Sequence, residues 1–227
     1  MENQFKEIAA IIGDPTRATV LWALMDGKAL TATELAIAAD TSAQNISMHL
    51  NKMVQADFLS VESQGRHRYY RFAKKEIAYA MESLACLIPE TGNSFAKSNT
   101  ENIVAIKYCR TCYDHLAGKI GVEVTDSLLK QKLILQVNKS FELTKRGEKW
   151  FRSFDINTEE LKVQRRSFLR PCLDWSERRY HIAGSLGAAL LKKMMEAGVF
   201  RKMKNSRALI ITPQGHKKLH EIFKLST

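Results

Sequence analysis

The 227-residue sequence predicts a mainly α-helical fold with small β-hairpins, an α+β protein. Three observations support this prediction: two short helical patterns joined by a tight turn, a basic hairpin directly after them, and a set of helices and hairpins that occurs twice in the remaining chain. A proline and a glycine at Pro89 and Gly92 mark a linker. We therefore expect a domain over residues 1–89, a linker over 90–100, and two repeats over 101–156 and 157–227.

The two helical patterns of the N-terminal domain begin at good capping residues. Thr31, with Glu34 three residues later, predicts a capping box for the first helix, and Thr41 and Ser42, both good caps, predict the start of the second. The second helix carries an apolar stripe at i, i+4, i+7 and i+8, formed by Ile46, Leu50, Met53 and Val54. Two such helices joined by a tight turn predict a helix-turn-helix.

The opposite face of the second helix is polar and contains no carboxylate that would repel phosphate. Its residues are Ser42, Gln44, Asn45, Ser47, His49 and Lys52. Amides and hydroxyls can read base edges in the major groove, while a lysine can bind the backbone. The pattern favours a recognition helix, with an ordinary polar surface helix as the alternative.

A hairpin is predicted next, because two strand-like runs surround a turn at Gln64 and Gly65. The tip and the returning strand carry Arg66, His67, Arg68 and Tyr69, followed by Arg71. Cations on a hairpin can meet phosphates or a minor groove. The pair of helices and the hairpin together predict a winged helix-turn-helix, and the expected partner of this fold is double-stranded DNA.

The order of these motifs resembles that of the ArsR family of bacterial transcriptional repressors. The resemblance covers about residues 1–89 and lies in Ile11-Ile12-Gly13-Asp14-Pro15-Thr16-Arg17, Thr33-Glu34-Leu35-Ala36, Ser47-Met48-His49-Leu50 and Gly65-Arg66. It implies a homodimer that pairs through its first and last helices, here about residues 3–12 and 76–88, and reads a two-fold symmetric operator. Packing of the same apolar residues onto the domain's own core is the alternative.

The chain departs from the family at the positions where many relatives bind metals. The helix before the recognition helix, residues 34–40, contains no cysteine. The last helix of the domain contains no histidine, and its candidate ligands are Glu76, Glu82 and Cys86. Any sensing function is therefore expected in the rest of the chain.

Composition and charge narrow the function classes. No signal peptide and no apolar run of membrane-spanning length is present, so we expect a cytoplasmic protein without a membrane partner. Phosphate-loop, dinucleotide-binding and hydrolase motifs are missing from the sequence, which weighs against an enzyme.

The charge is distributed unevenly along the chain. Residues 1–89 carry 9 basic and 10 acidic side chains, whereas residues 90–227 carry 26 basic and 14 acidic side chains. The basic excess therefore lies outside the helix-turn-helix, either as a second DNA or ligand surface or as a solvated face.

The two repeats are expected to be reduced winged-helix-like units. The first is predicted to contain helices over residues 101–118 and 126–132, a hairpin turning at Asn138-Lys139, and a helix capped by Thr144. The second is predicted to contain a helix over 186–197, a hairpin, and a helix capped by Thr212 and begun by Pro213. Ser127-Leu128-Leu129-Lys130 matches Ala189-Leu190-Leu191-Lys192, which supports a duplication.

Each repeat also carries a cysteine, an aspartate and a histidine near its start. If the copies pack symmetrically, Cys112, His115, Cys172 and His181 could converge as a Cys2His2 set for zinc or another divalent metal, with Asp114 and Asp174 as outer partners. Cys109, three residues before Cys112, is expected on the same helix face and offers a second metal or redox route. A redox or electrophile-sensing thiol and inert core packing are the alternatives.

The sequence as a whole predicts a DNA-binding transcriptional regulator. We expect a homodimeric repressor whose operator binding is modulated by a signal, of unknown effector, received in the C-terminal region. Two other functions stay open: a thiol- or metal-dependent enzyme, and an interaction adaptor built from tandem winged helices.

Overall fold

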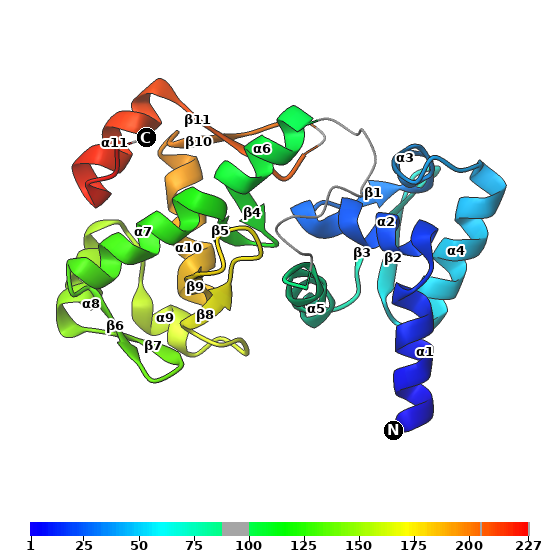
Figure 1. The fold of residues 1–227 in the computed structure, drawn as a ribbon, viewed down its shortest axis with the longest axis horizontal. Coiled ribbons are helices and arrows are strands. Elements are labelled where there is room, and N and C mark those ends of the chain that lie inside the picture. Colours follow the sequence, from blue (N-terminus) through cyan, green and yellow to red (C-terminus); the bar gives the residue numbers. More distant parts are fainter. Residues whose placement is uncertain (88–99, 205, 227) are drawn as a thin grey trace. The chain divides into compact units, whose positions relative to one another are not determined.

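In the computed structural model, which describes residues 1–87, 100–204 and 206–226, the chain divides into two units, Met1–Glu82 and Ser83–Thr227 (Figure 1). The elements of the first unit are α1 (Glu2–Ile12), α2 (Pro15–Ala23), a 3-10 turn (Leu24–Asp26), β1 (Leu30–Thr31), α3 (Ala32–Ala38), α4 (Ala43–Gln55), β2 (Leu59–Gln64), β3 (His67–Phe72) and α5 (Lys75–Ala85), which continues past the division.

The predicted helix-turn-helix is formed by α3 and α4. Thr31 accepts a hydrogen bond from the backbone of Glu34, whose carboxylate accepts one in return from the Thr31 backbone, so the capping box is confirmed. Of the two expected caps of α4, Ser42 is the one that accepts a hydrogen bond from the Asn45 backbone. The apolar stripe of α4 packs inward, because Ile46, Leu50 and Met53 are completely buried.

The predicted wing is also present. Strands β2 and β3 pair antiparallel from Leu59 opposite Phe72 to Gln64 opposite His67, and β1 adds to the free edge of β3. The two-residue turn places Gly65 at φ +60°, a conformation that glycine adopts without strain. This short connection fixes the register and directs the wing tip away from the core.

The second unit contains the same succession of elements twice. The first copy consists of α6 (Thr100–Tyr108), β4 (Arg110–Cys112), β5 (His115–Ala117), α7 (Gly118–Lys130), β6 (Ile134–Val137), β7 (Ser140–Leu143) and α8 (Lys145–Ser153). The second consists of α9 (Thr158–Lys162), β8 (Arg170–Leu173), β9 (Tyr180–Ala183), α10 (Gly184–Glu196), β10 (Phe200–Lys202), β11 (Leu209–Ile211) and α11 (Pro213–Phe223).

Equivalent local contacts accompany this repeated order. Thr144 accepts a hydrogen bond from the backbone of Gly147 at the start of α8, and Thr212 does so from Gly215 at the start of α11. A Cβ atom on Gly147 would lie 2.0 Å from the carbonyl oxygen of Leu133. A Cβ on Gly215 would lie 2.1 Å from the carbonyl oxygen of the equivalent residue, Val199. Both helices thus begin directly against the backbone of the residue that precedes the first strand of the neighbouring hairpin.

The predicted helix over residues 101–118 is wrong. The helix ends at Tyr108, and a hairpin, β4 and β5, occupies residues 110–117 before α7 begins at Gly118, well before the expected position 126. Tyr113 has φ +58° and Gly118 has φ +77°, so neither continues a right-handed helix. Every residue of the two strands is buried, so the sequence shows no alternation that would distinguish strand from helix.

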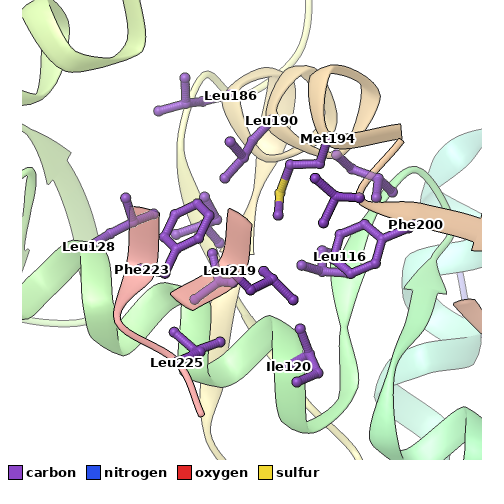
Figure 2. Packing of buried hydrophobic residues seen from close by; sticks show 14 of the residues in the cluster. Leu116, Ile120, Leu128, Leu186, Leu190, Met194, Phe200, Leu219, Phe223 and Leu225 are labelled. Atoms are coloured by element: carbon purple, nitrogen blue, oxygen red, sulfur yellow. The ribbon is translucent and has the colours of Figure 1, made fainter. Parts of the chain in front are cut away.

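The two copies share one hydrophobic core (Figure 2). Ile120 and Leu128 of α7 belong to the same buried cluster as Leu186 and Leu190 of α10, and Leu219 of α11 joins them. A common core means that the repeats support one another rather than fold as separate layers.

Among the described residues, no single helix is both long and apolar enough to cross a membrane, although the bent pair Glu2–Ile12 and Pro15–Asp26 passes that test by length and composition.

Candidate functional site

The α4 helix presents most of the predicted base-reading residues to solvent. Ser42, Gln44, Ser47 and Lys52 are exposed. Asn45 is half-buried, and its amide nitrogen donates a hydrogen bond to the Thr41 hydroxyl at 2.7 Å. The exposed face of α4 thus combines an amide, hydroxyls and an ammonium group.

His49 does not belong to this exposed face, contrary to our expectation. Its side chain is buried, and its Nδ1 atom lies 3.5 Å from the Arg17 guanidinium and 3.6 Å from the Asp14 carboxylate. The backbone N–H of Arg17 donates to Asp14 at the start of α2 and, together with other contacts, lowers the pKa of that carboxyl. These contacts attach α4 to the start of α2, so His49 positions the helix.

The hairpin between β2 and β3 exposes its cations. Arg66, His67 and Arg68 are exposed, while Tyr69 is half-buried. Arg71 pairs with Glu62 across the strands at 3.1 Å, so its charge is partly compensated. Arg66 and Arg68 thus supply the cationic tip that a wing needs to meet phosphate.

A second cluster lies in the C-terminal unit, where the two unpredicted hairpins face each other. Cys112 pairs with His115 across β4 and β5, and Cys172 pairs with His181 across β8 and β9. Strand β5 contacts β9, and the ligand atoms of all four side chains lie within 4.8 Å of one another. The structure therefore brings together the four residues that the duplication suggested.

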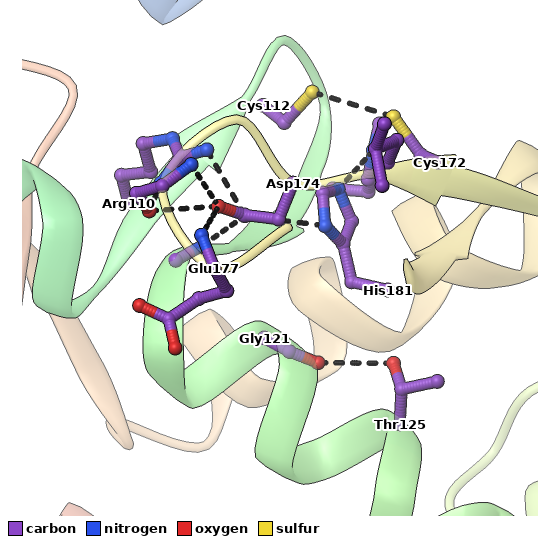
Figure 3. A network of polar contacts seen from close by, with 12 residues as sticks. Arg110, Cys112, Gly121, Thr125, Cys172, Asp174, Glu177 and His181 are labelled. Atoms are coloured by element: carbon purple, nitrogen blue, oxygen red, sulfur yellow. Dashed lines mark hydrogen bonds and ion pairs between the residues drawn. The ribbon is translucent and has the colours of Figure 1, made fainter. Parts of the chain in front are cut away.

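The side-chain atoms of this Cys/His cluster lie close together. The Sγ atoms of Cys112 and Cys172 are 3.9 Å apart (Figure 3), and the Nε2 atoms of His115 and His181 are 3.1 Å apart. All four residues are buried.

Each histidine is flanked by a carboxylate on its other ring nitrogen. Asp114 lies 3.2 Å from Nδ1 of His115, and Asp174 lies 3.3 Å from Nδ1 of His181. Both Nε2 atoms therefore point into the cluster, while both Nδ1 atoms point to an aspartate. Each aspartate thus contacts a histidine of the cluster on the side away from the other three candidate ligands.

Two arginines compensate the carboxylates, and each pair joins the two repeats. Arg110 of the first copy donates to Asp174 of the second at 3.0 Å, and Arg166 from the segment before β8 donates to Asp114 at 2.5 Å (Figure 3 for Asp174). Asp174 also accepts a hydrogen bond from the Gly118 backbone at 2.7 Å. Sequence reasoning missed both arginines, although Arg110 stands two residues before Cys112, just as Arg170 does before Cys172.

The surroundings of the cluster favour the thiolate form of Cys172 and the charged form of His181. The hydrogen bond from Cys112 lowers the pKa of the Cys172 thiol far below its usual range despite burial, and both histidines contribute. Burial opposes charge on His181, but Asp174 and Cys172 outweigh it and raise the pKa of the imidazole. Burial likewise opposes charge on Asp174, yet His181 and Arg110 hold the pKa of its carboxyl well below the ordinary value.

Cys109 is placed elsewhere. It follows α6, outside any helix shared with Cys112, and is buried in the hydrophobic core with Leu116 and Ile120. Burial raises the pKa of its thiol well above the usual range. The expected second route through Cys109 and Cys112 on one helix face is therefore wrong.

A capped helix pair, an exposed polar second helix and a cationic hairpin define the first unit as a winged helix-turn-helix, the architecture of DNA-binding regulators. Residues 12–62 match the family model described as a helix-turn-helix domain. The chain is 42% identical over 215 residues to the uncharacterized HTH-type transcriptional regulator YdfF of Bacillus subtilis (strain 168), and the match covers 95% of each protein. The chain therefore belongs to the HTH-type transcriptional regulators, and double-stranded DNA is the partner of this class.

Solved structures with similarity to the chain cover about a third of it. Reduced HlyU from Vibrio cholerae N16961 is 18% identical, with a TM-score of 0.34 over 37% of this chain and 86% of that one. The winged helix-turn-helix domain of Mb0332 from Mycobacterium bovis, described as homodimeric and as a possible ArsR-family regulator, is 18% identical, with a TM-score of 0.34 over 36% of this chain and 75% of that one.

Proposed function

We propose that this regulator is a homodimeric repressor that binds a two-fold symmetric operator through α4 and the wing. The observation that carries the proposal is that one unit exposes both the polar face of α4, with Gln44 at its N-terminal end, and a cationic wing tip at Arg66. The N-terminal residues of a recognition helix contact base edges, while a cationic wing contacts the backbone. The two elements therefore have different roles on the duplex.

Dimer formation is supported by apolar side chains that the chain leaves in solvent. Phe5 and Ile8 of α1 are 69% and 44% exposed, and Leu84 and Leu87 in and after α5 are 39% and 76% exposed. The ArsR-like motif order implies pairing through these same two helices. Burying the four side chains against a second copy would remove a large apolar area from water.

The C-terminal unit is proposed to receive the signal that changes operator affinity. Two observations support this role: it lies outside the matched helix-turn-helix segment, and it contains the buried Cys/His cluster. A signal can shift DNA binding only through different affinities for two states of the protein. Gel shifts with metal-stripped, metal-loaded and mildly oxidised protein compare those states directly.

The main test is footprinting of the full chain on the DNA upstream of its own gene, at moderate salt. We expect protection of a symmetric site that overlaps the promoter. Gln44→Ala should weaken specific binding by about 10- to 100-fold, the cost of a good base contact. Gln136→Ala changes a glutamine of β6 that is also exposed; it is the matched control and should bind normally.

Two results would overturn the proposal. One is the lack of a protected symmetric site at any protein concentration, and the other is equal operator affinity of Gln44→Ala and Gln136→Ala. A protected site from which purified RNA polymerase starts more often in the presence of the protein would contradict repression while leaving DNA binding intact.

A further inference from the structure

We propose that Cys112, His115, Cys172 and His181 form a closed tetrahedral site for a thiophilic divalent metal of the zinc class, which joins the two repeats. The proposal concerns the C-terminal unit and does not depend on repression, because its test measures the metal itself.

The distances within the Cys/His cluster fit such a site before any ion is considered. In a regular tetrahedron with metal–sulfur bonds of about 2.3 Å and metal–nitrogen bonds of about 2.0 Å, two sulfurs lie ~3.8 Å apart and two nitrogens ~3.3 Å apart. The observed separations are 3.9 Å between the Sγ atoms and 3.1 Å between the Nε2 atoms. The sulfur–sulfur and nitrogen–nitrogen edges of the shell therefore have about the right length, and all four ligand atoms lie within 4.8 Å of one another.

The orientation of the imidazoles points to the same conclusion. Each Nδ1 lies beside an aspartate oxygen, an arrangement that favours a proton on Nδ1 and leaves Nε2, which points into the cluster, to bind an ion. The two Nε2 atoms lie 3.1 Å apart in a buried place, about the distance between two nitrogen ligands of one tetrahedral ion. A metal-bound histidine that donates its other N–H to a carboxylate is the usual arrangement in metal sites.

The charge balance selects a divalent cation. Arg110 compensates Asp174 and Arg166 compensates Asp114, so the carboxylates need no further partner. When the ion binds, both thiols lose their protons to solvent, and two thiolates with two neutral imidazoles carry a charge of −2. A divalent ion neutralises this buried shell, and two sulfur with two nitrogen ligands favour zinc over magnesium or calcium.

The four ligands also decide the role of the ion. Four protein side chains fill a tetrahedral shell, which is typical of structural sites, whereas catalytic zinc keeps one position for water. Each repeat supplies one cysteine and one histidine from a single hairpin. The ion therefore fastens β4 and β5 to β8 and β9.

The test uses the purified full chain and reads the metal in two ways. Elemental analysis should find one zinc per chain. After removal of zinc under reducing conditions, cobalt(II) should bind with the intense visible absorption of a tetrahedral ion and with a sulfur-to-cobalt charge-transfer band. Cys112→Ser and His181→Asn should each abolish stoichiometric zinc, whereas Cys86→Ser, a cysteine outside the cluster, should retain it.

The cobalt titration of the unmodified chain keeps the proposal testable if a ligand variant fails to fold. The proposal is overturned if the reduced chain takes up no cobalt, if its cobalt spectrum is that of an octahedral ion, or if Cys112→Ser retains as much zinc as Cys86→Ser. It is equally overturned if the chain is purified without metal and its mass shows the loss of two hydrogens that a Cys112–Cys172 disulfide requires.

Discussion

The Nε2 atoms of His115 and His181 lie 3.1 Å apart, although 66 positions separate the two residues in the chain. The contact follows from equivalent hairpins, because each histidine is the cross-strand neighbour of a cysteine in its own repeat.

Removal of the metal should destabilise the protein. An ion that binds the folded state contributes about 2.7 kcal/mol when its free concentration is about 100 times its dissociation constant. For a chain of this size the melting temperature should then fall by roughly 5–10 °C. Thermal melts of the reduced protein with zinc and with a chelator check this, and unchanged melts would contradict it.

Asp174→Asn should weaken metal binding without removing a ligand. The change leaves His181 in place but takes away the carboxylate beside its Nδ1, and such outer partners are worth about 10- to 100-fold in affinity. Competition with a coloured chelator measures the effect. Asp126→Asn, which breaks an exposed pair with Arg179, is the control and should bind zinc as the unmodified chain does.

His49→Ala should act on the stability of the first unit rather than on base preference. The buried imidazole contacts Arg17 and Asp14, so its loss leaves these polar groups with a missing partner at a cost of about 1–3 kcal/mol. Urea unfolding monitors the change. If the variant unfolds normally but prefers a different operator sequence, His49 reads bases and this interpretation of its burial is wrong.

Gly147→Ala should be strongly destabilising, by about 3 kcal/mol or more, because its Cβ would collide with the backbone of Leu133. Lys149→Ala on the same helix changes an exposed side chain and should shift stability by less than about 0.5 kcal/mol. Denaturant midpoints of the two variants provide the comparison. Similar midpoints would mean that α8 does not start against the hairpin as described.

Cys109 should resist alkylation in the folded protein. Burial raises the pKa of its thiol well above the ordinary value, so the reactive thiolate is scarce at neutral pH and gains population only at strongly alkaline pH. Cys86, which is half-buried, should react first with iodoacetamide. Peptide mapping after a timed reaction distinguishes the two, and faster modification of Cys109 would contradict its placement in the core.

Local capping chemistry made much of the fold predictable from sequence. Thr31, Ser42, Thr144 and Thr212 cap helices as expected, and Gly65 marks the wing. These signals act over three or four residues and need no knowledge of the rest of the chain. The four residues of the Cys/His cluster were suggested by a different signal, the repeated order of cysteine, aspartate and histidine in the two copies.

Features that depend on distant contacts were not predictable in this way. The hairpins that carry the cluster are three or four residues long per strand and largely buried, so their sequences resemble pieces of a core helix. The roles of Arg110 and Arg166 depend on contacts with carboxylates 64 and 52 positions away, which the local sequence does not indicate. His49 has the sequence position of a base reader, and the side chains packed around it, not its spacing, bury it.

Each repeat holds half of the proposed coordination shell. Neither hairpin offers more than one cysteine and one histidine, so a separate repeat could complete the shell only by meeting a second copy. Covalent linkage replaces that encounter with an intramolecular one, at an effective concentration that two free partners in a cell would not reach. The duplication thus does within one chain what other proteins achieve by pairing two subunits around a shared ion.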